Sequence, residues 1–298
     1  MATGYRDPKS VRVSLGAFDA PSTLLDGVID RDPRPWLRLS IGAAALAAVG
    51  SAIALRDVDR FYGALTTSFS DQAIAQDLVN LFFVSPVMAL LAWRGLRNSL
   101  ASYLVWLGFL TFTVYNYAIY TFSIDFGPLF PLWVAVLGMA TFSLIGGAAA
   151  VVPTGVANAL GNRKERFTGV FMLVVVTLFA IMWLADIVPA LLDDSVPDSV
   201  RDVGLPTNPV HVLDLAFFLP AVAFVGWALL QRHPLGYAAA PAMLVFLTLT
   251  GLPILTTVFV ADHDGHDAAW QLLAPIGVIT VTSAILTWVM VHHLRLRR

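Results

Sequence analysis

The chain has 298 residues, of which 58% are hydrophobic and only 13% are charged. Soluble domains have roughly 45–50% apolar and about 25% charged residues, so this composition excludes a soluble globular protein. The mean hydropathy of +0.76 indicates a polytopic membrane protein, and the formal net charge is −2. Because the chain has no cysteine, disulfides and thiolate metal sites are also excluded.

Eight apolar runs of about twenty residues lie along the chain, which is the length that a helix needs to cross a hydrocarbon core of about 30 Å. The runs are apolar all round rather than alternating, so they predict helices and not the strands of a barrel. We therefore predict an all-α polytopic membrane protein with eight transmembrane helices. The predicted helices are Trp36–Leu55, Gln76–Trp93, Leu100–Phe122, Leu129–Val151, Phe167–Leu191, Pro209–Leu230, Leu235–Ala261 and Ala268–His292.

Lysine and arginine residues are concentrated in every second connection between these runs. They precede the first run, follow the second, fourth and sixth runs, and end the chain. Cytoplasmic loops carry such an excess, so we expect both termini on the cytoplasmic side of a bacterial cytoplasmic (inner) membrane. The other connections are rich in aspartate. This acidic extracytoplasmic face would concentrate cations, although short outer loops that simply lack basic residues would give the same pattern.

The sequence matches itself at an offset of 134 residues, which aligns Asp77–Tyr103 with His211–Tyr237. The offset also places the first, third and fourth runs over the fifth, seventh and eighth. We therefore predict two four-helix repeats, 36–152 and 167–293. Because each repeat crosses the membrane an even number of times, the two are parallel, as in transporters whose sites lie at a repeat interface. Identical pairs include Leu81 and Leu215, Phe83 and Phe217, Pro86 and Pro220, Ala89 and Ala223, and Tyr103 and Tyr237.

The remaining segments are short. We expect residues 1–35 to form a cytoplasmic N-terminal tail without a cleaved signal peptide, because no uninterrupted apolar core precedes a small-residue cleavage site. Residues 153–166 are expected to form a basic cytoplasmic linker between the repeats, and residues 294–298 a cytoplasmic C-terminus.

Two pairs of polar residues open the matching second and sixth runs. Asp77 and Asn80 begin one run, and His211 and Asp214 begin the other. Each pair is three residues apart and so lies on one helical face. If the repeat axis brings the two helices together, the four side chains converge on one pocket in the outer half of the membrane. Carboxylates and an imidazole suit a divalent cation, with Asp77, His211 and Asp214 as candidate ligands, and no other cofactor is expected.

Helix capping is an alternative explanation of these residues. Asn208 is typical of an N-cap that is followed by proline in the first turn, and aspartate is favoured near a helix N-terminus. His211 and Asp214, however, lie a turn or more inside an apolar run. Ionisable groups at membrane depth are costly and are usually functional or paired, so capping explains these two less well than a binding pocket does.

Further candidate residues lie in the same half of the membrane. The third run carries a polar stripe whose members Asn116 and Tyr117 could line the pocket, although such a stripe more often makes hydrogen bonds between helices. Asp186, near the outer end of the fifth run, could complete the pocket or lie at the membrane interface. The loop 262–267 resembles a metal-binding tract by composition. Without a second spaced cluster, a solvated acidic loop explains it better.

Proline recurs inside the runs, and Pro86 and Pro220 are matched by the repeat. Each lies about two turns inward from a pair of polar groups, removes a backbone donor and can kink its helix. The carbonyl groups that such a kink frees can line a cavity. Alternatively, the kink serves only the packing of neighbouring helices.

The segment Trp93–Arg97, together with Tyr115–Tyr120 and Leu129–Ala135, resembles a broad set of multi-span bacterial membrane proteins to which no activity is assigned. The resemblance covers the second to fourth runs and implies a multi-span fold. It implies no activity.

The leading functional hypothesis is a transporter or channel for a cation or a cation-coupled solute. A metal-dependent membrane enzyme acting on a lipid or lipid-linked substrate is an alternative, and a non-catalytic accessory subunit of a membrane complex is another. No phosphate-binding loop, nucleophile elbow or helical zinc-protease motif is found in the sequence. Expected partners are membrane lipids, a small ion or solute, and a second copy of the chain or a larger membrane complex, with no nucleic acid.

Overall fold

The computed structural model describes residues 27–161 and 165–295. Within these ranges the chain is helical, with one isolated β-bridge between Ile29 and Val151. The expected N-terminal tail up to residue 26, residues 162–164 of the expected linker, and residues 296–298 lie outside the described residues. The prediction of an all-α protein is therefore confirmed for the part of the chain that the structure describes.

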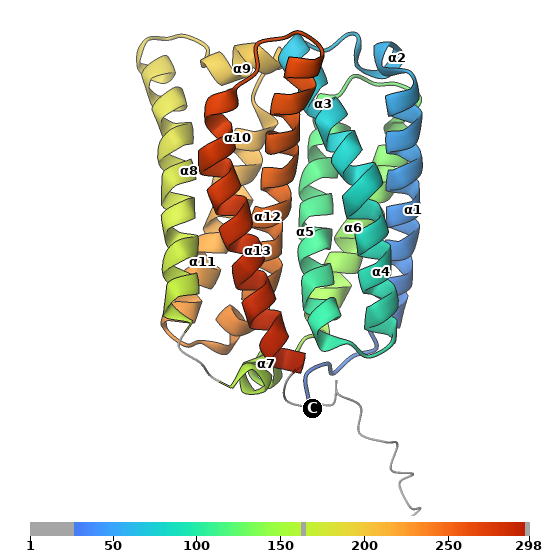
Figure 1. Ribbon diagram of the computed structural model, residues 1–298, viewed down its shortest axis with the longest axis vertical. Helices are drawn as coiled ribbons and strands as arrows, with labels where there is room; N and C mark the ends of the chain where they lie inside the picture. The colour runs from blue at the N-terminus through green and yellow to red at the C-terminus, as the bar shows by residue number, and fades with distance from the viewer. Residues whose placement is uncertain (1–26, 162–164, 296–298) are drawn as a thin grey trace, which may run out of the picture.

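The long helices stand side by side in one bundle, with the short helices α2 and α9 at one end and α7 at the other (Figure 1). The α-helices are α1 (Arg34–Arg56), α2 (Val58–Tyr62), α3 (Thr67–Val79), α4 (Ser85–Leu96), α5 (Leu100–Ser123), α6 (Phe130–Ala149), α7 (Pro153–Leu160), α8 (Arg166–Leu192), α9 (Asp198–Val203), α10 (Pro209–Leu213), α11 (Leu219–Leu230), α12 (Pro234–His263) and α13 (Leu273–Arg295). The π-helical segments are η1 (Asn80–Val84) and η2 (Asp214–Phe218), and a 3-10 turn, η3 (Trp270–Leu272), precedes α13.

Seven helical segments of the described chain are long and apolar enough to cross a membrane, and they correspond to seven of the eight predicted runs. The third run forms α5, which has 24 residues. Tyrosine, threonine and asparagine side chains make α5 less apolar in composition than the other seven. Most of its side chains are buried, because α5 packs against α4, α6 and α12. The segments are Arg34–Arg56, Thr67–Leu96, Phe130–Ala149, Arg166–Leu192, Pro209–Leu230, Pro234–His263 and Trp270–His292.

Two of these segments widen into a π-helix at positions that differ by the same 134 residues. The backbone N–H of Ser85 bonds to the carbonyl of Asn80, and that of Leu219 bonds to the carbonyl of Asp214. The next residue is a proline in both segments. Proline has no N–H, and its ring clashes with the carbonyl four residues earlier, so a wider turn accommodates it. Such turns are rare and frequently lie at functional sites.

The two halves of the bundle pack differently. In the first half α1 and α5 both contact α4 and α6, so the long helices form a closed ring. In the second half α8 packs on α11, α11 on α12, and α12 on α13, without a comparable contact between α8 and α13. Many large apolar side chains of α8 are exposed. The second half is therefore open along one side.

Helices α5 and α12 join the two halves. A Cβ atom added to Gly108 of α5 would lie 2.5 Å from the Cβ atom of Val245 and 2.7 Å from the carbonyl oxygen of Ala242, both in α12. A glycine permits this close approach of two helices. The junction between the halves is thus made by a tight contact near the middle of α5.

Candidate functional site

Asp77 lies inside the first half and is 1% exposed. Its Oδ1 atom accepts hydrogen bonds from the hydroxyl groups of Ser51 at 2.7 Å and Tyr120 at 3.1 Å. Its Oδ2 atom accepts one from the Tyr62 hydroxyl at 2.5 Å. No ion pair to Asp77 is formed within the described chain. Hydroxyl donors supply no positive charge, and an uncompensated buried carboxylate is costly, so a proton or a bound cation is the natural partner of this group.

Tyrosine side chains surround Asp77. Tyr62, on α2 outside the candidate spans, is fully buried. Burial, and next the charge of Asp77, raise the pKa of the Tyr62 hydroxyl above its ordinary value, so Tyr62 remains a donor. Tyr117, one of the predicted site residues, is buried close to Asp77 and Ser51. Its ring packs against that of Tyr120 with 5.5 Å between centroids.

Unpaired polar groups continue inward from Asp77. Because α5 runs antiparallel to α3 and α4 (Figure 1) and Tyr120 contacts Asp77, Asn80 and Asn116 lie at a similar depth, about one turn farther in. Both side chains are buried, and their amide nitrogen atoms have no hydrogen-bond partner among the residues that the structure describes. The buried hydroxyl of Ser85 also has none. Buried polar groups are nearly always paired, so this series points to a site that a polar ligand can use.

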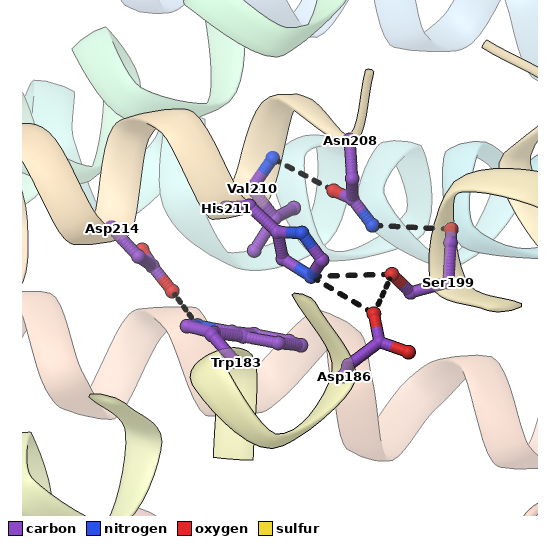
Figure 2. Close-up of polar contacts among 7 residues, drawn as sticks. All are labelled: Trp183, Asp186, Ser199, Asn208, Val210, His211 and Asp214. Atoms are coloured by element: carbon purple, nitrogen blue, oxygen red, sulfur yellow. Dashed lines mark hydrogen bonds and ion pairs between the residues drawn. The ribbon is translucent and has the colours of Figure 1, made fainter. Parts of the chain in front are cut away.

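His211 lies in the second half, beside α9 (Figure 2). Its Nε2 atom is 3.3 Å from the Ser199 hydroxyl and 3.9 Å from Oδ2 of Asp186. The same hydroxyl donates to Oδ2 of Asp186 at 2.5 Å. Asn208 accepts from the backbone N–H of Val210 at 2.9 Å and donates to the Ser199 carbonyl at 3.2 Å. The predicted N-cap at Asn208 is thus confirmed, and Ser199 links α8, α9 and the start of α10.

The contacts around His211 do not have the order that activates a serine nucleophile. In a catalytic triad the imidazole lies between the hydroxyl and the carboxylate. Here Ser199 donates directly to Asp186. The Asp186 side chain is 27% exposed and that of His211 is 7% exposed, so the cluster places an almost buried imidazole next to a carboxylate that reaches the surface.

Asp214 lies about one turn deeper than His211 and is 7% exposed. The Trp183 indole Nε1 donates to Oδ2 of Asp214 at 2.9 Å, and the Trp183 ring packs against the His211 ring with 4.7 Å between centroids. Tyr115 of α5 also interacts with Asp214, and its ring meets that of Phe218 edge-on at 4.9 Å. Asp214 therefore has one partner in each half of the bundle.

A small cavity adjoins Asp214. Its volume is about 30 Å³, which exceeds the ~10–15 Å³ that one water molecule needs. Its walls come from α8, α11, α12 and α13 and are mostly apolar, with Thr250 and Thr280 among them. The cavity thus lies where α8 and α13 fail to pack together. A larger cavity, lined by residues that include Asp30–Arg34, contains none of the predicted site residues.

The structure does not bring the predicted residues together in one pocket. The partners of Asp77 come from α1, α2 and α5, whereas His211 and Asp214 are held mainly by α8 and α9. The two halves meet mainly where α12 packs against α3 and α5. Within the described residues, no hydrogen bond or ion pair joins Asp77 or Asn80 to His211 or Asp214. The side-chain oxygen of Asn80 accepts a hydrogen bond from Gln76 Nε2 at 3.2 Å, so this contact also stays within the segment that carries Asp77. The shared pocket is therefore replaced by two separate polar centres.

The predicted metal ligands Asp77, His211 and Asp214 are separated by the same arrangement. In the described ranges, the one group of three histidine, aspartate or glutamate side chains with mutually close ligand atoms is Asp71, Asp264 and His266. The loop 262–267 therefore has a partner that the sequence did not reveal. This partner is a single residue, Asp71 on α3.

Sequence reasoning missed most of the partners that build the two centres. Ser51, Trp183 and Ser199 are single polar or aromatic residues in runs or loops that show no motif. They lie 12 to 31 residues from the groups they contact. Trp183 and Ser51 stand inside apolar runs, and their isolated polar atoms are the one signal that could have indicated them.

Comparison of the chain with protein-family models, curated proteins and solved structures finds no match. Its function is therefore inferred from the chemistry of the two centres.

Proposed function

We propose that this protein is a membrane transporter or channel for a proton or another small cation, or for a solute that moves with such a cation. Asp77 is the proposed cation-binding group of the first half. Asn80, Asn116 and Tyr117 line the path that leads inward from it. A divalent metal ion is the other candidate occupant of Asp77.

In the second half, Asp214 and His211 are the proposed binding groups. Asp186 lies at the exposed edge of this centre and is the group through which it would exchange a cation with the outside. Asp214 interacts with Tyr115 of the first half. A change in the charge of Asp214 would therefore act on a side chain of the other half.

The single observation that carries the proposal is the environment of Asp77. A carboxylate that is 1% exposed receives three hydroxyl hydrogen bonds and, within the described ranges, forms no ion pair. Ionisable groups inside a membrane are rare, expensive and usually part of an ion or proton path. The side-chain amide nitrogens of Asn80 and Asn116, next along the helices, have no hydrogen-bond partner among the described residues, which supports a path rather than a sealed structural pair.

The proposed architecture has eight crossings in two parallel four-helix repeats, with α5 as the eighth crossing. Matched π-helical segments support the repeat. The order of contacts also supports it, because α1, α4, α5 and α6 follow one another as α8, α11, α12 and α13 do. We further propose that the end with α7 faces the cytoplasm, because the basic connections belong to that end. Both termini would then be cytoplasmic in a bacterial inner membrane.

A flux assay with the purified protein in lipid vesicles tests the proposal. Proton uptake is followed with an enclosed pH-sensitive dye under an imposed membrane potential, and Na⁺, K⁺ and Mn²⁺ uptake are followed in parallel. We expect flux of at least one cation to exceed that of empty vesicles and to fall at least about tenfold in Asp77→Asn, the effect of ~1.4 kcal/mol.

Asp125→Asn is the matched control for this assay. It removes the same charge from an exposed position in the connection between α5 and α6, so we expect unchanged flux. Equal flux in Asp77→Asn and the original protein, or no flux above empty vesicles for any of these cations, would contradict the proposal.

A lipid-directed membrane enzyme is the second candidate. The observation that favours it is the mostly apolar cavity beside Asp214, which is lined by α8 and α13 on the open side of the bundle. Incubation with extracted bacterial lipids, followed by mass spectrometry, separates the two candidates. New lipid products that disappear in Asp214→Asn, together with absent cation flux, would favour the enzyme.

A further inference from the structure

We infer that Asp71, Asp264 and His266 form a binding site for a divalent transition-metal ion, of which Zn²⁺ is the best fit. The site lies at the end of the bundle opposite α7 and joins the two halves. It is separate from the two buried centres and does not depend on the proposed transport.

The three ligand atoms converge from two distant parts of the chain. His266 Nδ1 is 3.1 Å from Oδ1 and 3.0 Å from Oδ2 of Asp71. One ligand atom from each of the three residues lies within 4.8 Å of the others. Ligands at ~2.0–2.2 Å from a tetrahedral zinc ion are about 3.3–3.6 Å apart, so small movements of exposed side chains complete the geometry. Water would take the fourth position.

The backbone holds all three ligands in place. Asp71 lies within α3 and is 3% exposed, so its carboxylate has little freedom. Helix α12 ends in a turn with Gly265 at φ 76°, in which His266 N–H bonds to the Ala261 carbonyl. The left-handed glycine permits this helix ending. It sets His266 two residues beyond Asp264 and directs both towards α3, which packs on α12.

The ligand set selects the class of metal. An imidazole with two carboxylates suits zinc and similar first-row ions, whereas calcium and magnesium prefer oxygen ligands alone. The neighbouring Asp262 and Asp267 are exposed and add negative charge that attracts a cation. A bound ion would hold the α12–α13 connection of the second half against α3 of the first half.

Metal titration of the full-length purified protein tests this site. After removal of metals with a chelator, Zn²⁺ is titrated against a chromophoric competitor, and Co²⁺ is added separately to observe the visible absorption bands of a protein-bound ion. We expect one equivalent to bind, with affinity reduced at least about tenfold in His266→Gln and Asp264→Asn. Both positions are exposed, so we expect these variants to fold as the original protein does, and a change in affinity then reports on the site. Bound Zn²⁺ should also raise the thermal unfolding temperature of the original protein and not that of His266→Gln.

His263→Ala is the matched control, because His263 is exposed at the end of the same helix and is not among the three ligands. We expect it to bind Zn²⁺ as the original protein does. The inference is overturned if the original protein binds no Zn²⁺, if His266→Gln binds it equally well, or if His263→Ala weakens binding as much as His266→Gln. The last result would show an adventitious ion only.

Discussion

The two halves of this bundle treat their polar groups in opposite ways. In the first half the ring of α1, α4, α5 and α6 is closed, and Asp77 is sealed inside it with three hydroxyl donors. In the second half α8 is held mainly by α11, and Asp214 lies beside a small cavity, with an indole donor from Trp183 and an interaction with Tyr115 of α5. Both halves share a π-helical turn before a proline. The difference shows that the environment of a polar group depends on whether the fourth helix of its half closes the ring.

The comparison predicts that cation flux falls more when Asp77 is replaced than when Asp214 is replaced. Asp77→Asn should abolish cation flux, whereas Asp214→Asn should lower it only by roughly threefold to tenfold, or about 0.7–1.4 kcal/mol. The physical reason is that Asp77 has no cationic partner and little access to solvent, while water can reach Asp214. The vesicle assay measures both variants side by side. A greater loss of flux in Asp214→Asn than in Asp77→Asn would contradict this ranking of the two carboxylates.

A second prediction concerns the contact that joins the halves. Gly108→Val adds side-chain atoms where Val245 and the Ala242 carbonyl leave no space. Overpacking of this kind typically destabilises by ~1–3 kcal/mol, so we expect a lower thermal unfolding temperature in detergent. Gly138→Val on α6 is the control, because a Cβ atom there has no neighbour within 4 Å. Equal stability of the two variants would mean that α5 and α12 can separate without cost.

A third prediction compares one donor from each centre. Tyr62→Phe removes a hydroxyl from a fully buried carboxylate, and we expect a loss of stability of ~1–3 kcal/mol. Trp183→Phe removes the indole donor of Asp214, which lies next to a cavity where water can replace it, so we expect less than about 1 kcal/mol. Thermal unfolding of the two variants measures the difference. A larger loss in Trp183→Phe would show that the second centre is the better sealed one.

A fourth prediction concerns the N-cap at the start of α10. Asn208→Ala removes the side chain that accepts from the Val210 N–H, which typically costs about 1 kcal/mol at an N-cap. It should also loosen α9, because Asn208 holds the Ser199 carbonyl. Asn208→Asp keeps the acceptor of the cap but lacks the donor to the Ser199 carbonyl, so it separates the two roles of the side chain. We expect hydrogen exchange of the α9 amides to be faster in both variants, and the loss of stability from the missing cap only in Asn208→Ala. Unchanged α9 exchange in both variants would contradict the prediction.

Some features of the two centres were predictable because they depend on neighbours in the chain. The cap at Asn208 and an irregular helical turn ahead of Pro86 and Pro220 follow from local chemistry. The partners of Asp77 were not predictable, because Ser51 and Tyr120 lie on helices whose apolar faces can pack in several ways. The contact of Asp71 with His266 was not predictable either, because Asp71 belongs to no motif and the two residues are 195 positions apart in the sequence.

The sequence by itself determined the helical class, the position of the long apolar segments and the matched placement of polar groups before two prolines. Hydropathy and helical periodicity act over one or a few turns, so they can be read from residues in order. Only the tertiary structure decided that α5 is buried between the halves, that Asp77 and His211 belong to separate centres, and that Asp71 meets the α12–α13 connection. Those outcomes depend on how whole helices pack, and packing joins residues that the chain keeps far apart.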